Sequence, residues 1–362
     1  MESKTAVEQS LPPQAVIMQM AMGAWVTKVI SEVTRLGVPD LLKQHGKMHA
    51  TEIVTAGGIR AAPNALERLL RACASLGVFT EDAKGKFGPT ELSEVLTSDS
   101  PASVKKLVEA IGGPWYRCWA ELLDAIKTGE PQARKVFGME WWDYLNANPR
   151  ELEDFGEAMK SNSLSSLRGV LENCDFKGVK KIADIGGGFG HLAVALLEKY
   201  PTLQAVVMDL PDLIPMAQER FSVNDRAIAN RLEYVAGDMF DSVPAANVYI
   251  MKHIIHDWED ERCIRLLQNC HQSMQGDGRV ICVDSVLPPM GNVAGTPAKL
   301  LDINMLVFIE GKERAEDQWS HLYRTAGFEI RSITPIHDNF GTALSKVSSN
   351  GPRNPFRRRI CG

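Results

Sequence analysis

The sequence predicts an α/β protein in which a doubly wound, mostly parallel sheet follows a mostly helical N-terminal domain. Two observations lead to this prediction. Up to about residue 170 the apolar residues recur at helical spacing, whereas after about residue 178 short β-rich runs alternate with helical ones. Such alternation is typical of a parallel sheet covered by helices on both faces. The length of 362 residues is consistent with two domains.

The composition is that of a globular protein whose partner is a small molecule. The net charge of -5 and the isoelectric point near 6.0 give no general attraction to nucleic acid or to an anionic membrane. The N-terminus lacks the basic region of a signal peptide, and the apolar stretch 15–30 is interrupted by Gln19 and Lys28. Seven scattered cysteines without a C-x-x-C pair favour a reducing compartment, so we expect a cytoplasmic protein.

The first predicted helix covers residues 14–42 and is interrupted at 37–39 by the sequence Gly-Val-Pro. It is rich in methionine and alanine, and such a face packs equally well against a second subunit or within the same chain. Helices at 50–56 and 62–76, followed by a short hairpin over 78–89, predict a winged-helix-like unit.

Winged-helix units often bind DNA, and the charge of this one bears on that alternative. Residues 1–110 contain twelve Lys and Arg against twelve Asp and Glu, and the helix that would contact DNA offers mainly Arg68 and Arg71. This balance disfavours a surface that follows phosphates. We therefore expect no nucleic-acid partner.

The second half of the chain supplies the sheet. Further helices are predicted at 115–126, 141–147 and 152–170. The five predicted parallel strands and the two strands of a closing antiparallel hairpin are 181–185, 204–208, 232–235, 248–251, 279–283, 328–335 and 343–348. We therefore expect domains at 1–165 and 166–349, and a disordered tail at 350–362.

A glycine-rich loop with the sequence DIGGGFG, residues 184–190, lies where the first strand meets the next helix. Glycine allows a ligand to approach the backbone closely there, as in Rossmann-like folds. A dinucleotide fingerprint would have a further glycine where this chain has His191, so a dinucleotide is disfavoured. Asp209 and Asp238 end the next two strands. Each alone would be read as a turn residue, but with the loop they predict an adenosine ligand, its ribose on Asp209 and its adenine on Asp238 and Met239.

Two histidines, His253 and His256, follow the fourth predicted strand at the same edge of the sheet. Histidine titrates nearest physiological pH, so this segment is expected to supply a general base. Its other ring nitrogen needs an orienting acid, for which Asp284 and Glu313 are candidates. The two histidines could instead ligate a metal. No third ligand has convincing spacing, so we expect no metal.

Taken in order, the motifs DIGGGFGH, DLP, GDMF, KxxxHDW and GKER resemble those of the plant caffeate-type and bacterial small-molecule O-methyltransferases, over roughly residues 15–348. The resemblance implies S-adenosyl-L-methionine as the cofactor, S-adenosyl-L-homocysteine as its product, metal-independent transfer and an N-terminal domain that forms an intertwined homodimer. It implies that His256 is the base and that Glu313 orients it. Asp284 occupies the place of a second orienting acid, where the plant enzymes have glutamate. The cofactor residues implied by the resemblance are Gly186, Asp209, Leu210, Asp238, Met239 and Lys252.

The resemblance also implies an acceptor pocket. Its residues are Phe155, Met159, Asn162, Met305 and Ile309. Aromatic and thioether side chains can hold a flat ring, and core packing explains them equally well. Asn162 stands where the plant enzymes have histidine, and Glu310 stands where bacterial relatives have glycine. These differences make a lignin-type phenylpropanoid less expected as the acceptor.

We therefore predict methyl transfer from S-adenosylmethionine to a hydroxyl of a small aromatic metabolite, phenolic or polyketide-like. Two alternatives stay open at this point. The same fold and cofactor could serve decarboxylation, hydroxylation or a pericyclic reaction, and the chain could be a DNA-binding regulator that senses the cofactor. His256 and Glu313 favour methylation over the other reactions.

Overall fold

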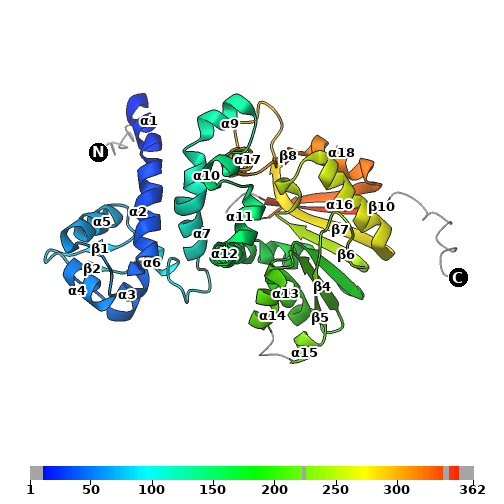
Figure 1. The fold of residues 1–362 in the computed structure, drawn as a ribbon, viewed down its shortest axis with the longest axis horizontal. Coiled ribbons are helices and arrows are strands. Elements are labelled where there is room, and N and C mark those ends of the chain that lie inside the picture. Colours follow the sequence, from blue (N-terminus) through cyan, green and yellow to red (C-terminus); the bar gives the residue numbers. More distant parts are fainter. Residues whose placement is uncertain (1–10, 222–225, 337–341, 350–362) are drawn as a thin grey trace, which may run out of the picture. The chain divides into compact units, whose positions relative to one another are not determined.

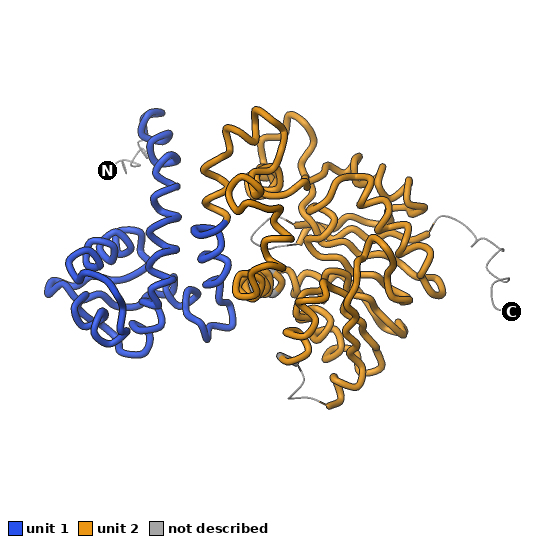
Figure 2. Tube along the Cα trace, in the orientation of Figure 1, with its two compact units in different colours: residues 1–114 blue, residues 115–362 orange. Residues whose placement is uncertain are grey.

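The computed structural model describes residues 11–221, 226–336 and 342–349, and the chain divides into two compact units (Figure 1, Figure 2). Unit 1 ends at Pro114 and unit 2 begins at Trp115. The helices between 115 and 165 thus belong to the same compact unit as the sheet, and the predicted domain boundary near 165 stays a prediction. The expected disordered tail and the turn at 337–341 lie outside the described residues.

Unit 1 contains short helices packed around a small hairpin. Its elements are α1 Pro13–Ala21, α2 Gly23–Arg35, α3 Val38–His45, α4 Ala50–Ala56, α5 Pro63–Ser75, β1 Thr80–Glu81, β2 Phe87–Gly88, α6 Glu91–Glu94 and α7 Lys105–Ala110. The helix, helix and hairpin of the winged-helix-like prediction are present, with β1 and β2 paired antiparallel. The helix predicted over 14–42 is divided twice. Gly37 adopts a left-handed φ of 71° before α3, and a slighter break falls at Met22, whose backbone stays right-handed.

Unit 2 is built on an eight-stranded mixed sheet. Its strands are β3 Lys181–Ile185, β4 Gln204–Asp209, β5 Leu232–Ala236, β6 Ala246–Lys252, β7 Met274–Leu287, β8 Arg314–Ala315, β9 Phe328–Pro335 and β10 Thr342–Ser349. The order is β5-β4-β3-β6-β7-β10-β9, with β8 paired to β7. Strands β3 to β7 are parallel, whereas β10 is antiparallel to both β7 and β9, which confirms the doubly wound sheet with a closing antiparallel strand.

Both faces of the sheet are buried, because successive side chains along each strand enter opposite cores. On β6, Tyr249 and Met251 join the core beneath α16 and α18, whereas Val248 and Ile250 join the core beneath α12 and α13. The helices and turns of unit 2 are η1 Ile111–Trp115 at the junction of the units, α8 Tyr116–Trp119, α9 Leu122–Thr128, α10 Ala133–Phe137, α11 Trp141–Ala147, α12 Pro149–Asn173, α13 His191–Lys199, α14 Leu213–Phe221, α15 Arg226–Ala229, η2 Ile255–Asp257, α16 Asp260–Ser273, α17 Thr296–Phe308 and α18 Glu316–Thr325. Two buried faces explain the continuous apolar runs that the sequence shows at the strands.

A third core of unit 2 joins its helical layer to the glycine loop. Trp141, Leu152 and Phe308 pack with Phe189, which belongs to that loop. Gly156 on α12 permits this packing, because a Cβ atom there would lie 2.6 Å from the Phe189 ring. Among the described helices, none combines the length and the apolar character that crossing a bilayer requires.

Candidate active site

The carboxyl ends of the parallel strands bring the predicted site segments to one edge of the sheet. β3 leads into Gly186, β4 ends at Asp209, and β6 ends at Lys252. β5 lies beside β4 and leads through Gly237 to Asp238. Segments that are up to 66 residues apart in sequence therefore meet because the sheet is parallel.

The glycine loop is tied to the end of β4 by backbone hydrogen bonds. The Gly188 N–H donates to Asp209 Oδ2 (2.7 Å), and the Leu210 N–H donates to Asp209 Oδ1 (2.8 Å). Gly186 has a left-handed φ of 65°, and a Cβ atom there would lie 2.3 Å from Ile254 Cδ1. Each carboxylate oxygen can accept a second hydrogen bond, so Asp209 retains acceptor capacity for a ligand with two neighbouring hydroxyls.

Acidic groups dominate the electrostatics beneath the loop. Asp184 is buried, and its Oδ2 has no hydrogen-bond partner among the described residues. Burial raises the pKa of Asp184 to about 7, which Asp209 raises further and Lys252 opposes. Above Gly188 a Cβ atom would meet no atom within 4 Å, so the loop borders open space.

The end of β5 offers a second contact region. Asp238 is exposed, and its Oδ1 accepts a hydrogen bond from the Phe240 N–H (2.8 Å). Met239 is partly buried against the core under α16, and its carbonyl accepts from Asn269 Nδ2 (3.0 Å). The acid and the thioether are therefore held by a fixed turn, as a contact to a flat polar base requires.

The histidine predicted as base is buried and paired with the predicted acid. His256 lies in η2 and is 5% exposed, and Glu313 is 2% exposed. Their atoms Nδ1 and Oε1 are 2.6 Å apart. The Glu313 N–H donates to Asp302 Oδ1 (2.9 Å), which fixes the acid from α17. Burial raises the pKa of Glu313 well above its usual range, and Arg314 opposes this shift.

Two further acids surround the imidazole. Asp284 Oδ1 lies 3.9 Å from His256 Nδ1, beyond hydrogen-bonding distance, and neither carboxyl oxygen of Asp284 has a hydrogen-bond partner among the described residues. Asp257 Oδ1 lies 3.3 Å from His256 Nε2. Burial raises the pKa of Asp257 and of Asp284 to about 7 each. These two carboxyl groups therefore change protonation near neutral pH.

The predicted acceptor residues fall in and around the aromatic core of unit 2. Phe155, Met305 and Ile309 belong to the same cluster, where the Phe155 ring packs against Trp141 (5.8 Å between centroids). Met159 lies one turn further along α12 and is half-buried. Asn162 lies on the same helix, and its side chain is outside the described part of the structure.

Sequence reasoning missed several residues of this neighbourhood. Trp142 packs against Phe155 (5.8 Å) and stacks on Trp258 (6.0 Å), so it joins the acceptor residues to the histidine turn. Its place in the Trp-Trp pair that begins α11 was the available signal. Asp184 and Asp257 lie inside the motifs DIGGGFGH and KxxxHDW, and their burial, which no sequence pattern shows, sets them apart.

Among the described residues, one group of side chains is spaced so that it could hold a metal ion. It consists of His253, His256 and Asp284, whose possible ligand atoms all lie within 4.8 Å of one another. His253 has the only left-handed φ (53°) of a described residue other than glycine, and its N–H donates to Val283 O (3.0 Å). The expectation of a metal-independent site stays a prediction.

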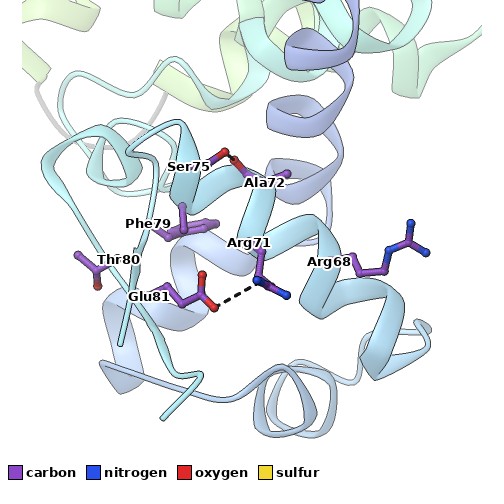
Figure 3. A pocket seen from close by; sticks show the side chains of 8 residues that line it. Arg68, Arg71, Ala72, Ser75, Phe79, Thr80 and Glu81 are labelled. Atoms are coloured by element: carbon purple, nitrogen blue, oxygen red, sulfur yellow. Dashed lines mark hydrogen bonds and ion pairs between the residues drawn. The ribbon is translucent and has the colours of Figure 1, made fainter. Parts of the chain in front are cut away.

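Unit 1 carries a surface hollow of about 810 Å³ between α5 and β1 (Figure 3). It contains both arginines on which the DNA-binding alternative depends. Arg71 Nε lies 3.5 Å from Glu81 Oε1, so an acid opposes one of these two charges. The hollow thus offers little excess positive charge for a phosphate backbone.

The strand order, the acid-lined glycine loop and the buried histidine at one edge define unit 2 as a Rossmann-like domain of the kind that binds a nucleoside cofactor beside a general base. Comparison with known proteins identifies the family. Residues 119–329 match the O-methyltransferase domain, and residues 18–99 match the O-methyltransferase dimerisation domain.

Individual relatives agree along most of the chain. A phenazine O-methyltransferase of Lysobacter antibioticus is 33% identical over 329 residues, covering 90% of this chain and 94% of its own. The mitomycin biosynthesis 6-O-methyltransferase of Streptomyces lavendulae is 33% identical over 317 residues, covering 86% and 88%. Human N-acetylserotonin methyltransferase in complex with S-adenosylmethionine has a TM-score of 0.85 at 28% identity and covers 95% of this chain and 100% of its own.

The chain therefore belongs to the S-adenosylmethionine-dependent O-methyltransferase family, and it carries the dimerisation domain of that family. This confirms the predicted enzyme class and cofactor. The residues present fit the cofactor, because the space above Gly188 is open and Asp209 beside it keeps acceptor capacity for two neighbouring hydroxyls, such as those of a ribose.

Proposed function

We propose that His256 is the general base for methylation of a hydroxylated, fused or substituted aromatic metabolite, and that Glu313 orients it. The observation that carries this proposal is the 2.6 Å contact between His256 Nδ1 and Glu313 Oε1 in a buried setting. A partner on Nδ1 sets the tautomer, since a proton held on Nδ1 leaves Nε2 as the acceptor.

The proton chemistry follows from this tautomer. When bound, S-adenosylmethionine supplies a methyl group activated by its sulfonium. A phenolic hydroxyl with an unperturbed pKa of about 10 is protonated at neutral pH, so a positioned base raises the rate of transfer roughly 10²–10⁴-fold. His256 Nε2 takes the hydroxyl proton, and Asp257 Oδ1, 3.3 Å from that nitrogen, faces the imidazolium that forms. Glu313 holds the ring from Nδ1 and so keeps Nε2 turned toward the hydroxyl.

We assign the cofactor to Gly186, Asp209, Leu210, Asp238, Met239 and Lys252. In this assignment the ribose hydroxyls donate to Asp209, while Asp238 accepts from the adenine amino group and Met239 packs on the ring. Lys252 lies close enough to Asp184 to lower its pKa, so it balances the acids beneath the loop.

The acceptor class is supported by the aromatic cluster and by the relatives. Phe155, Met159, Asn162, Met305 and Ile309 are proposed to line the pocket, with Trp142 and Trp258 added from their stacking (6.0 Å). Relatives are named for phenazine and mitomycin substrates, and one structural neighbour (TM-score 0.76, 28% identity, covering 90% of this chain and 96% of its own) was crystallised with 2-hydroxy-5-methyl naphthoic acid. All have flat ring systems, which aromatic walls can hold.

We further propose a homodimer formed through the dimerisation domain, residues 18–99. Exposed apolar side chains on α1 and α2, among them Met20 (69% exposed) and Trp25 (68%), supply a surface that a second copy would cover.

The test combines His256→Ala with methyl-labelled S-adenosylmethionine and a panel of hydroxylated phenazines, naphthoic acids and quinones. Label transfer is expected to fall about 10²–10⁴-fold, while the dissociation constant of S-adenosylhomocysteine changes by less than about threefold. Replacement of the exposed His321 by Ala is the matched control. Unchanged label transfer by His256→Ala would remove this residue as the base.

A further inference from the structure

Arg314 is the most heavily bonded buried cation of the described structure, and it touches neither the imidazole of His256 nor the glycine loop. It is 0% exposed. Its Nη1 donates to Ile255 O (3.1 Å) and Lys312 O (3.3 Å), and its Nη2 donates to Trp258 O (2.7 Å). Both Nε and Nη2 donate to Asp260 Oδ1 (3.0 and 2.8 Å). A buried guanidinium is tolerated only when its donors are satisfied in this way.

These acceptors enclose the histidine turn. Ile255 O and Trp258 O are the carbonyls on either side of His256 and Asp257, and Asp260 begins α16 directly after the turn. The internal bonds of the turn are long, because the Asp257 N–H reaches Ile254 O at 3.2 Å and the Trp258 N–H reaches Ile255 O at 3.4 Å. Short 3₁₀ turns hold themselves weakly. The guanidinium therefore spans a segment with little rigidity of its own.

The segment that carries Arg314 is itself fixed on the opposite side. Arg314 and Ala315 form β8, which pairs with the end of β7. The Lys312 N–H donates to His256 O (2.9 Å). At Gly311 a Cβ atom would lie 1.9 Å from His256 O and 2.7 Å from the carbonyl carbon of Asp257, so the two backbones touch where glycine stands. Residues 311–314 thus fix the position of the histidine turn relative to the sheet.

We propose that Arg314 is the positioning residue for His256: it holds the two carbonyls that flank the histidine, so that Nδ1 meets Glu313 and Nε2 faces the acceptor hydroxyl. This inference rests on the proposed role of His256 as base. Lysine cannot replace this arginine, because an ammonium lacks the planar fork that reaches two carbonyls and a carboxylate at once. A base displaced by about 1 Å loses on the order of 10²-fold in rate.

The first experiment compares Arg314→Ala, Arg314→Lys and the exposed control Arg324→Ala in steady-state label transfer. We expect kcat to fall about 10–10²-fold for both Arg314 variants, with the dissociation constant of S-adenosylhomocysteine within about threefold of wild type. Millimolar guanidinium chloride, but not potassium chloride at the same ionic strength, should restore part of the rate of Arg314→Ala. Wild-type kcat in both variants would overturn the proposal.

A double-mutant cycle separates this inference from the proposed function. If Arg314 acts through the histidine, Arg314→Ala lowers the residual rate of His256→Ala by less than about twofold. An equal fold-loss in both backgrounds overturns the positioning role while leaving the base intact. Failure of the base proposal appears separately, as undiminished transfer by His256→Ala alone.

Loss of a buried arginine can prevent folding, which thermal unfolding would reveal. Gly311→Ala then carries the test, because its methyl group displaces the same turn without removing a charge. Its kcat should fall at least tenfold with cofactor affinity retained, and this loss should vanish in the His256→Ala background. A Gly311→Ala enzyme with wild-type kcat would refute the positioning role.

Discussion

The cofactor edge and the histidine cluster use buried acids in opposite ways. Both oxygens of Asp209 accept backbone N–H groups at 2.7 and 2.8 Å, supplied by the glycine loop and by the next residue. Neither oxygen of Asp284 has a hydrogen-bond partner among the described residues, and its close neighbours include the acid Glu313. The first acid is held by local backbone, whereas the second is held only by the fold around it.

This contrast separates affinity from turnover. An acid that is fixed by loop backbone is prearranged to accept hydrogen bonds from a bound ligand, so its loss should weaken binding. A cluster of acids around an imidazole controls proton positions, so its changes should appear in kcat and in pH dependence.

The largest expected effect is that of Glu313→Gln. The amide can donate to His256 Nδ1 and so favours the wrong tautomer, with Nε2 protonated. We expect kcat to fall about 10²–10⁴-fold, as loss of an orienting acid does elsewhere, while the cofactor dissociation constant stays within about threefold. Label transfer and calorimetric titration with S-adenosylhomocysteine measure the two quantities. Glu316→Gln, three residues later and exposed, is the control. A Glu313→Gln enzyme that lost affinity instead would break the division.

The second prediction concerns the cofactor edge. Asp209→Asn replaces a carboxylate, which accepts at both oxygens, by an amide, which accepts only at its oxygen. The variant therefore accepts fewer hydrogen bonds from the ribose hydroxyls. A hydrogen bond to a charged group is worth about 1.5–3 kcal/mol, so the dissociation constant of S-adenosylhomocysteine should rise about 10–10²-fold. kcat at saturating cofactor should change by less than about threefold. Asp212→Asn, exposed and nearby in sequence, should change neither quantity.

The same division explains what the sequence could predict. The strands β3 and β9 have the predicted bounds, and Gly186, Asp209 and Asp238 lie at or just after strand ends at one edge of the sheet. Both could be predicted because local motifs and strand ends are visible in the sequence. The pairing of His256 with Glu313 came from family resemblance, since 57 residues separate them and only the fold joins them.

Other features depend on packing that no local pattern reveals. Strand β7 begins five residues before the predicted 279, because Met274 pairs with Ala246 in the register of the neighbouring strand. The grouping of residues 115–165 with the sheet depends on long-range contacts such as that of Gly156 with Phe189. The stack of Trp142 on Trp258 joins segments more than 110 residues apart.

Gly186→Ala tests whether the two regions are coupled through Ile254, which lies against Gly186 beside the histidine turn. Its left-handed φ of 65° costs an alanine about 1–2 kcal/mol, and the new methyl group would press on Ile254 beside the histidine turn. We expect a roughly 5–30-fold weaker cofactor dissociation constant together with a several-fold fall in kcat. Gly188→Ala has a similar φ of 58° but open space, so it should affect affinity alone. Ile254→Val, which removes the clashing Cδ1 atom, should recover part of the kcat loss. Equal kcat in the two glycine variants would show that the regions are uncoupled.

The smallest effect is a change in how stability depends on pH. Burial raises the pKa of Asp284 to about 7 from its ordinary value of 3.8. The folded state therefore holds a proton between these values that the unfolded chain has released, so the contribution of Asp284 to stability is present at low pH and is lost as the pH rises through about 7. Asp284→Asn removes this loss. In Asp284→Asn the free energy of unfolding in urea, measured from pH 4.5 to 8, should fall less steeply with pH. The difference in slope should correspond to about one bound proton, whereas the exposed Asp317→Asn should reproduce the wild-type slope. An unchanged slope in Asp284→Asn would show that Asp284 is ionised in the folded enzyme, and that the pH dependence comes from Asp257 or Glu313 instead.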